Sequence, residues 1–130
     1  MTLSTEKAIE SIHTMHILIE KIFTGNNQET DLQLLCEHFS PDFEMVGAAG
    51  KQLTFENVVQ LFASNEGKIP DIKIEIYDEE IILKNNHSIV LTYTEKHTKT
   101  TGILIRRACA LIEEVNGKMV WRYLQETFLA

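Results

Sequence analysis

Two amphipathic runs near the end of the chain, ILIRRACALIE (residues 103–113) and VWRYLQETF (residues 120–128), flank the dipeptide Asn116-Gly117. Asn-Gly is a preferred pair for the two-residue turn of a β-hairpin, particularly between runs of strand-forming residues. The stretch therefore predicts two long antiparallel strands. Both strands carry charged residues inside an otherwise apolar pattern.

The strand pattern continues upstream of this hairpin. Residues 72–77 alternate isoleucine with polar or amphipathic residues, and Asn85-Asn86 marks a turn into a further strand at 88–99. Thr100-Thr101-Gly102 connects that strand to the terminal hairpin. Four successive strands joined by short turns are expected to be antiparallel neighbours.

The first half of the chain has a helical period instead. Between Thr5 and Phe23 the apolar residues recur at intervals of three and four, and Gly25 follows as a C-terminal stop. A second helix is predicted over Asp31–Phe39 and a third from Thr54, with a short strand and a turn at 43–50. The expected fold class is α+β, with helices first and a long sheet after them.

Length and composition predict one domain over residues 1–130. The chain has 130 residues, 44% of them hydrophobic and 24% charged, and a formal net charge of -7. This charge argues against a nucleic-acid partner, because phosphate binding requires clustered Lys and Arg. No apolar run reaches the ~18 residues of a membrane span, and the first residues lack the pattern of a secretory leader, so we expect a cytoplasmic protein. Cys36 and Cys109 are expected to be buried free thiols rather than a disulfide.

Two segments carry a family resemblance. They are LCEHFSPDF (residues 35–43) followed by Gly47 and Gly50, and NGKMVW (residues 116–121). With the order of elements, they resemble the nuclear-transport-factor-2-like superfamily, and more narrowly its small SnoaL-like and calmodulin-dependent kinase association-domain-like members with a cystatin-like α+β fold. The resemblance implies a cone, in which a curved antiparallel sheet wraps the long first helix. It also implies a ligand pocket on the concave side and a homodimer through the convex side.

The Asn116-Gly117 turn predicts which side chains enter the cone. Counting outward pairs Arg107 with Glu126 on the inner face, and Cys109 with Leu124, while Trp121 lies on the convex face. A three-residue turn at residues 100–102 then places the inner side chains of the strand at 88–99 next to Arg107 and Glu126. A bulge, or a two-residue turn at Thr101-Gly102, would exchange Arg106 for Arg107.

The predicted site is a charged row within an apolar pocket. One of the acidic residues could act as general base, while Arg107 holds an anionic group or an enolate-like oxygen. The candidate catalytic residues are Glu95, Glu126 and His97. The candidate ligand-binding residues are Tyr93, Arg107, Phe128 and Leu124. The alternative is that the charges form a structural ion network.

No metal or cofactor is expected. His13 and His16 lie three apart on the first helix without a third ligand in reach, and both are interpreted as core or surface histidines. The family's isomerases and dehydratases use a pocket Asp or His with a Tyr, and here no Asp falls on the predicted concave strands. Glu95 or Glu126 would have to replace it.

Two functions remain open. The first is a small-molecule binding protein or cofactor-independent isomerase or lyase, whose ligand is small and apolar or anionic. The second is a non-catalytic dimerisation or protein-interaction module. A cavity of ~300 Å³ or more would favour the first, and a filled cone the second.

Overall fold

The computed structural model describes residues 4–129 and contains three helices and one six-stranded sheet. The helices are α1 (Thr5–Thr24), α2 (Asp31–Cys36) and α3 (Phe55–Ser64). The strands are β1 (Phe39–Val46), β2 (Gln52–Thr54), β3 (Lys73–Lys84), β4 (Ser88–Lys99), β5 (Gly102–Val115) and β6 (Lys118–Phe128).

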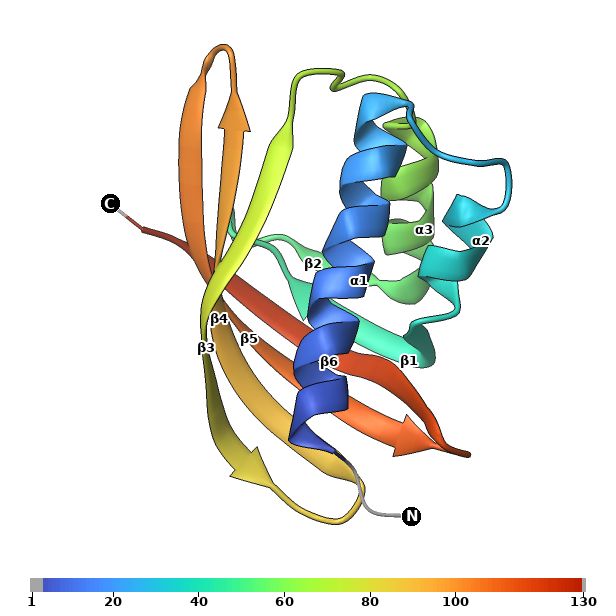
Figure 1. Cartoon of the computed structure of the whole chain (residues 1–130), viewed down its shortest axis with the longest axis vertical. Helices are drawn as coiled ribbons and strands as arrows, with labels where there is room; N and C mark the ends of the chain where they lie inside the picture. Colours follow the sequence, from blue (N-terminus) through green and yellow to red (C-terminus); the bar gives the residue numbers. More distant parts are fainter. Residues whose placement is uncertain (1–3, 130) are drawn as a thin grey trace.

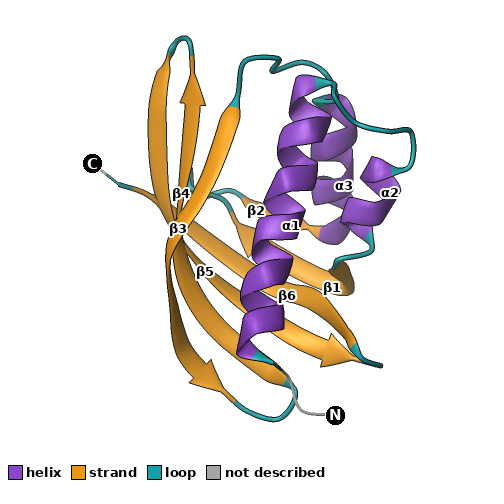
Figure 2. Cartoon of the chain, viewed as in Figure 1, coloured by secondary structure: helices purple, strands orange, loops and turns teal. Residues whose placement is uncertain are grey.

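The sheet has the strand order β2-β1-β6-β5-β4-β3. All neighbouring pairs are antiparallel except β1 and β6, which are parallel. The three helices lie on one face of the sheet, and the sheet curves around α1 (Figures 1 and 2). The predicted α+β class and the cone around the first helix are confirmed.

Helix α1 begins and ends as its sequence predicts. The Ser4 side chain accepts a hydrogen bond from the Lys7 amide, and Gly25 closes the helix at a φ of 82°. The buried stripe of α1 faces the concave side of the sheet, and it includes Ile12, which is fully buried. Within residues 4–129, no helix combines the length and apolar character needed to cross a membrane.

The second helix is shorter than predicted. Helix α2 ends at Cys36, and Phe39 begins β1 rather than ending the helix. The reason is the packing of Phe39 and Phe43, whose rings lie 4.7 Å apart and are buried in the core. Pro41 also favours an extended residue before it. The three-residue strand β2 was not predicted, because so short a segment has no measurable period.

The terminal hairpin turns at Asn116 and Gly117, as predicted. These residues have φ values of 53° and 81°, and Val115 pairs with Lys118. The register then shifts at Arg122, so that Ile112 pairs with Trp121 but Leu111 pairs with Tyr123.

This bulge makes the predicted convex position of Trp121 wrong. Its indole is only 2% exposed and lies on the concave face. Burial of so large an apolar ring stabilises the bulged register. The displaced Arg122 guanidinium donates to the Asp42 carbonyl at 2.6 Å.

The turn between β4 and β5 contains two residues instead of three. Lys99 pairs with Gly102, and the Asp71 carboxylate accepts hydrogen bonds from the Thr100 amide at 2.7 Å and the Thr100 hydroxyl at 2.8 Å. This one-residue change pairs Glu95 with Arg106. The predicted placement of Arg107 on the inner face is therefore wrong. Arg106 lies inside, as the alternative expected, although the two turn residues are Thr100 and Thr101 rather than Thr101 and Gly102.

Candidate functional site

A cavity of about 150 Å³ lies between α1, α3 and the concave face of the sheet. Most of its wall is apolar, with side chains such as Met15, Phe62 and Leu124. The polar wall is formed by five residues from four elements: His16 on α1, Glu95 and His97 on β4, Arg106 on β5, and Glu126 on β6. The cavity has half of the ~300 Å³ expected to favour ligand binding, but the cone is not filled.

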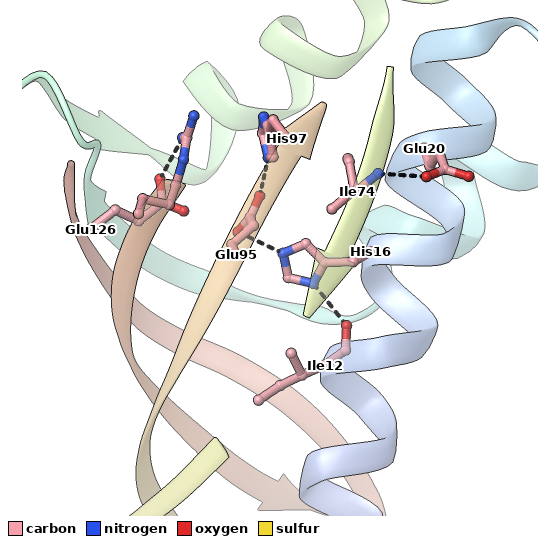
Figure 3. A network of polar contacts seen from close by, with 8 residues as sticks. Ile12, His16, Glu20, Ile74, Glu95, His97 and Glu126 are labelled. Carbon is pink, nitrogen blue, oxygen red and sulfur yellow. Dashed lines mark hydrogen bonds and ion pairs between the residues drawn. The ribbon is translucent and has the colours of Figure 1, made fainter. Parts of the chain in front are cut away.

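A chain of hydrogen bonds joins α1 to β4 through Glu95. The His16 ring bonds the Ile12 carbonyl through Nδ1 at 2.8 Å and the Glu95 carboxylate through Nε2 at 3.0 Å. The second oxygen of Glu95 bonds Nε2 of His97. Figure 3 shows Glu95 between the two histidine rings. His16 and Glu95 are 6% and 5% exposed, so water competes little with these bonds.

The partners in this chain fix where its protons lie. A carbonyl oxygen only accepts, so Nδ1 of His16 carries a proton, and Nε2 donates the second one to Glu95. Burial alone would lower the pKa of His16, but the charge and hydrogen bond of Glu95 raise it above its ordinary value. Burial would raise the pKa of Glu95, but the charge and hydrogen bond of His16, together with His97, lower it. The pair is therefore an imidazolium beside a carboxylate.

Glu95 also orients His97. The ionised carboxylate accepts from Nε2 of His97, so the His97 tautomer that fits this bond has its lone pair on Nδ1. His97 lines the cavity and its side chain is 14% exposed. Nδ1 is thus the nitrogen that can take a proton from a bound molecule, with Glu95 holding the tautomer.

Glu126 behaves differently from Glu95. Burial, together with the nearby charge of Glu95, raises the pKa of Glu126 to about 7, although Arg106 acts in the opposite direction. The contact between Arg106 Nη1 and Glu126 Oε1 is long, at 3.4 Å. One cavity therefore holds a carboxylate that stays ionised and a carboxyl group that titrates near neutral pH.

Three buried side-chain nitrogen or oxygen atoms in residues 4–129 lack a hydrogen-bond partner. They are the hydroxyl of Tyr93, Nε of Arg106 and Nε1 of Trp121. The Tyr93 ring packs edge to face on the His16 ring with centroids 5.7 Å apart, and the Trp121 ring is tilted against it at 6.0 Å. Burial and the charges of Glu95 and Glu126 raise the pKa of Tyr93 well above its ordinary value, so the hydroxyl keeps its proton. All three atoms are N–H or O–H donors, and unused buried donors are costly.

The structure brings together four of the seven predicted site residues in the cavity wall: Glu95, His97, Leu124 and Glu126. The other three lie elsewhere. Tyr93 is fully buried against Trp121 outside the cavity wall. Phe128 is 42% exposed and its ring lies 5.1 Å from the Arg106 guanidinium.

Arg107 lies on the convex face, because side chains alternate along β5 and the neighbouring Arg106 points inward. Its guanidinium donates to the hydroxyls of Thr94 at 2.9 Å and Thr92 at 2.8 Å, and to the Asp78 carbonyl at 2.9 Å. Arg106 takes the inner position that the sequence analysis gave to Arg107.

His16 is the site residue that the sequence analysis left out. As expected of a core histidine, His16 is buried, and both of its ring nitrogens are bonded. The signal was a histidine one helical turn from Ile12 on the apolar stripe of α1, where a buried charge requires a partner. The sequence does not show that Glu95 is that partner, because the contact joins residues 79 apart.

No group of three or more His, Cys, Asp or Glu residues suited to a metal ion occurs within residues 4–129. Cys36 and Cys109 are free, but the prediction that both are buried is wrong. Cys36 is partly buried, and Cys109 is exposed and pairs with Gln125 instead of Leu124. The polar groups of the cavity are instead suited to proton transfer. His97 can accept a proton, Glu126 can accept or donate one near neutral pH, and Arg106 can stabilise negative charge on oxygen.

Comparison with known proteins supports the fold and the family. No protein-family model matches the sequence, and no curated protein does. A nuclear-transport-factor-2-like protein of unknown function from Pseudomonas aeruginosa is 30% identical with a TM-score of 0.90, and the match covers 93% of this chain and 97% of that one.

Two more distant structures show the same fold. A candidate calcium/calmodulin-dependent kinase II association domain from Exiguobacterium sibiricum is 14% identical over 100% of this chain and 98% of that one, with a TM-score of 0.67. A candidate scytalone dehydratase from Novosphingobium aromaticivorans is 13% identical over 94% of this chain and 84% of that one, with a TM-score of 0.72. With its helices on one face of a curved sheet and its match to the Pseudomonas protein, the chain belongs to the nuclear-transport-factor-2-like family.

Proposed function

We propose that this chain binds a small molecule in the cavity and moves a proton on it, as a cofactor-independent isomerase or lyase does. The observation that carries the proposal is the pair of carboxyl groups in one apolar cavity, Glu95 and Glu126, whose pKa values shift in opposite directions. Environments that separate the pKa values of two neighbouring acids are a feature of acid and base catalysis.

The roles follow from the hydrogen bonds. Nδ1 of His97 removes a proton from the carbon next to a carbonyl group, and the C–H electron pair forms an enolate whose oxygen is stabilised by Arg106. Protonated Glu126 then returns a proton, either to a second carbon in an isomerase or to a departing hydroxyl group in a lyase. Dehydration is also the activity named for the Novosphingobium protein, which is similar to this chain in its fold only.

Proton exchange on small cyclic ketones tests this proposal. Cyclohexanone and 3-hydroxycyclohexanone are incubated with the protein in deuterated buffer, and NMR follows loss of the α-proton signals and formation of the enone. We expect faster exchange or dehydration with the wild type than with His97→Gln or Glu126→Gln. The matched controls are His87→Gln and Glu29→Gln, both at exposed positions. Equal rates in all five proteins would refute the proposal.

A homodimer through the convex face is a second proposal, corresponding to the interaction-module alternative. The strand registers align a row of apolar side chains across the sheet: Leu83, Val90, Leu111 and Tyr123. Leu83 is 61% exposed, and a second copy of the chain would bury this row against its own.

Light scattering tests the convex interface. Leu111→Glu should halve the mass of a dimer, because it places a charge in the middle of the buried row. Leu34→Glu introduces the same charge at an exposed position on α2 and should leave the mass unchanged. An unchanged mass for folded Leu111→Glu, confirmed by thermal unfolding, would contradict this interface.

A further inference from the structure

The guanidinium of Arg106 has most of its hydrogen-bonding capacity unused. It carries five N–H donors. Within residues 4–129 its Nε has no partner, and its polar contact to Glu126 is 3.4 Å long. Phe128 covers one face of the guanidinium at 5.1 Å. The Trp121 N–H, on the same cavity wall, is also unpartnered. These groups offer donors to an oxygen atom from outside the protein.

The charges of the cavity also favour an anionic ligand. His16 and Arg106 are cations, and Glu95 stays ionised because it is paired with His16. With Glu126 protonated, the charges of His16, Arg106 and Glu95 sum to +1. With Glu126 ionised, its own carboxylate supplies the anion that Arg106 lacks. Glu126 and an anionic ligand thus compete for the same guanidinium.

Among residues 4–129, the titratable and charged side chains that face Glu126 come from three elements. From β4, Glu95, Tyr93 and His97 face it, from β5 Arg106 does, and from α1 His16 does. The side chains that α3 adds to the cavity wall are apolar: Val58, Leu61 and Phe62.

We propose that the cavity binds a small flat monoanion, of the size of benzoate, whose oxygen atoms bond Arg106 in place of Glu126, and that Glu126 takes up one proton from solvent as the anion enters. The inference rests on the proposed function, since an enolate formed in the cavity is such an anion. The ligand class is a carboxylate or enolate on a single ring. A cavity of about 150 Å³ matches this size, since an engineered cavity of about 150 Å³ holds benzene.

The test uses the single tryptophan of the chain as a reporter. Trp121 lines the cavity, so its fluorescence is recorded while sodium benzoate is added at pH 6, 7 and 8. Benzyl alcohol, of similar size without charge, is the matched neutral probe. Titration calorimetry provides a second readout for both.

We expect the Kd for benzoate to rise about tenfold from pH 6 to pH 8. With a pKa of about 7, the protonated fraction of Glu126 falls from about 0.9 to about 0.1 over this range, and the apparent Kd varies inversely with that fraction. The Kd for benzyl alcohol should change less than twofold.

Variants separate the two residues that carry the proposal. Glu126→Gln should bind benzoate with a Kd that no longer changes with pH, because its amide mimics the protonated acid. Arg106→Gln should weaken benzoate binding at least tenfold and retain benzyl alcohol. Arg107→Gln changes the neighbouring arginine on the opposite face of β5 and should leave both values unchanged.

The outcomes distinguish this inference from the proposed function. If benzyl alcohol binds and benzoate does not, the anion inference fails and the pocket remains. If benzoate binds with a Kd independent of pH in the wild type, the proton uptake is refuted. If neither probe binds by fluorescence or calorimetry, the inference and the small-molecule pocket both fail. Should Arg106→Gln not fold, the pH profile of Glu126→Gln still decides the matter.

Discussion

Replacing Glu126 by Gln should stabilise the protein at alkaline pH and not at acidic pH. The folded pKa of Glu126, about 7, lies above its ordinary value of 4.5. Between these two values the folded state holds a proton that the unfolded state has lost, so wild-type stability falls as the pH rises from 4.5 to 7. Above pH 7 the full cost of the buried charge is present.

The magnitude follows from the difference between the two pKa values. At about 1.36 kcal/mol per pKa unit, the buried charge costs about 3 kcal/mol of unfolding free energy above pH 7. The side chain is 8% exposed, so solvent screens little of this cost. Glu126→Gln removes the charge and keeps the shape, and its advantage should grow from near zero at pH 4.5 to about 3 kcal/mol at pH 8.

Urea denaturation at pH 5, 6, 7 and 8 measures this advantage directly. The unfolding free energies of Glu126→Gln and wild type are compared at each pH, so that effects of other titrating groups cancel. Glu29→Gln is the control, because it changes an exposed carboxylate in a loop. A difference that stays constant from pH 5 to pH 8, or a variant less stable than wild type at pH 8, would refute the reasoning.

Three further changes test the packing around the site. His16→Ala leaves the Glu95 carboxylate buried without its cation and should cost about 3–5 kcal/mol of unfolding free energy at pH 7; a loss below about 1 kcal/mol would argue against the ion pair. Trp121→Ala should cost about 3–5 kcal/mol and leave the light-scattering mass unchanged, since the ring is buried inside; a change in mass would indicate an interface role. Gly117→Ala should cost about 1 kcal/mol or more in urea denaturation, because φ is 81° there; an equally stable variant would contradict the turn geometry.

The helices and the terminal hairpin could be predicted because their signals are local. The period of α1, its stop at Gly25 and the Asn116-Gly117 turn each depend on neighbouring residues. The inward set Tyr93, Glu95 and His97 also follows from simple alternation along β4.

The register errors have tertiary causes. The alternating pattern of VWRYLQETF is compatible with Trp121 on either face of the sheet. The bulge at Arg122 lets Trp121 point inward, where its ring is buried beneath α1. The turn between β4 and β5 depends on Asp71, which precedes β3 and lies 29 residues from Thr100. Each error shifts the pairing by one residue. For Glu126 the two one-residue shifts compensate each other, so its predicted inner position is correct. The inner position predicted for its partner Arg107 is wrong.

The two adjacent arginines of β5, one on each face of the sheet, bear on how this pocket could diverge. Inserting or deleting one residue in the Thr100-Thr101 turn would exchange Arg106 for Arg107, so a guanidinium would remain in the cavity. The same slip would bring Cys109 and Leu111 inward in place of Ala108 and Ala110, which are both buried. The larger side chains would crowd the core beside Tyr93 and Leu91, the β4 partners of Ala108 and Ala110. A change in hairpin length would therefore keep a guanidinium on the concave face, while it alters the packing of the core beneath α1.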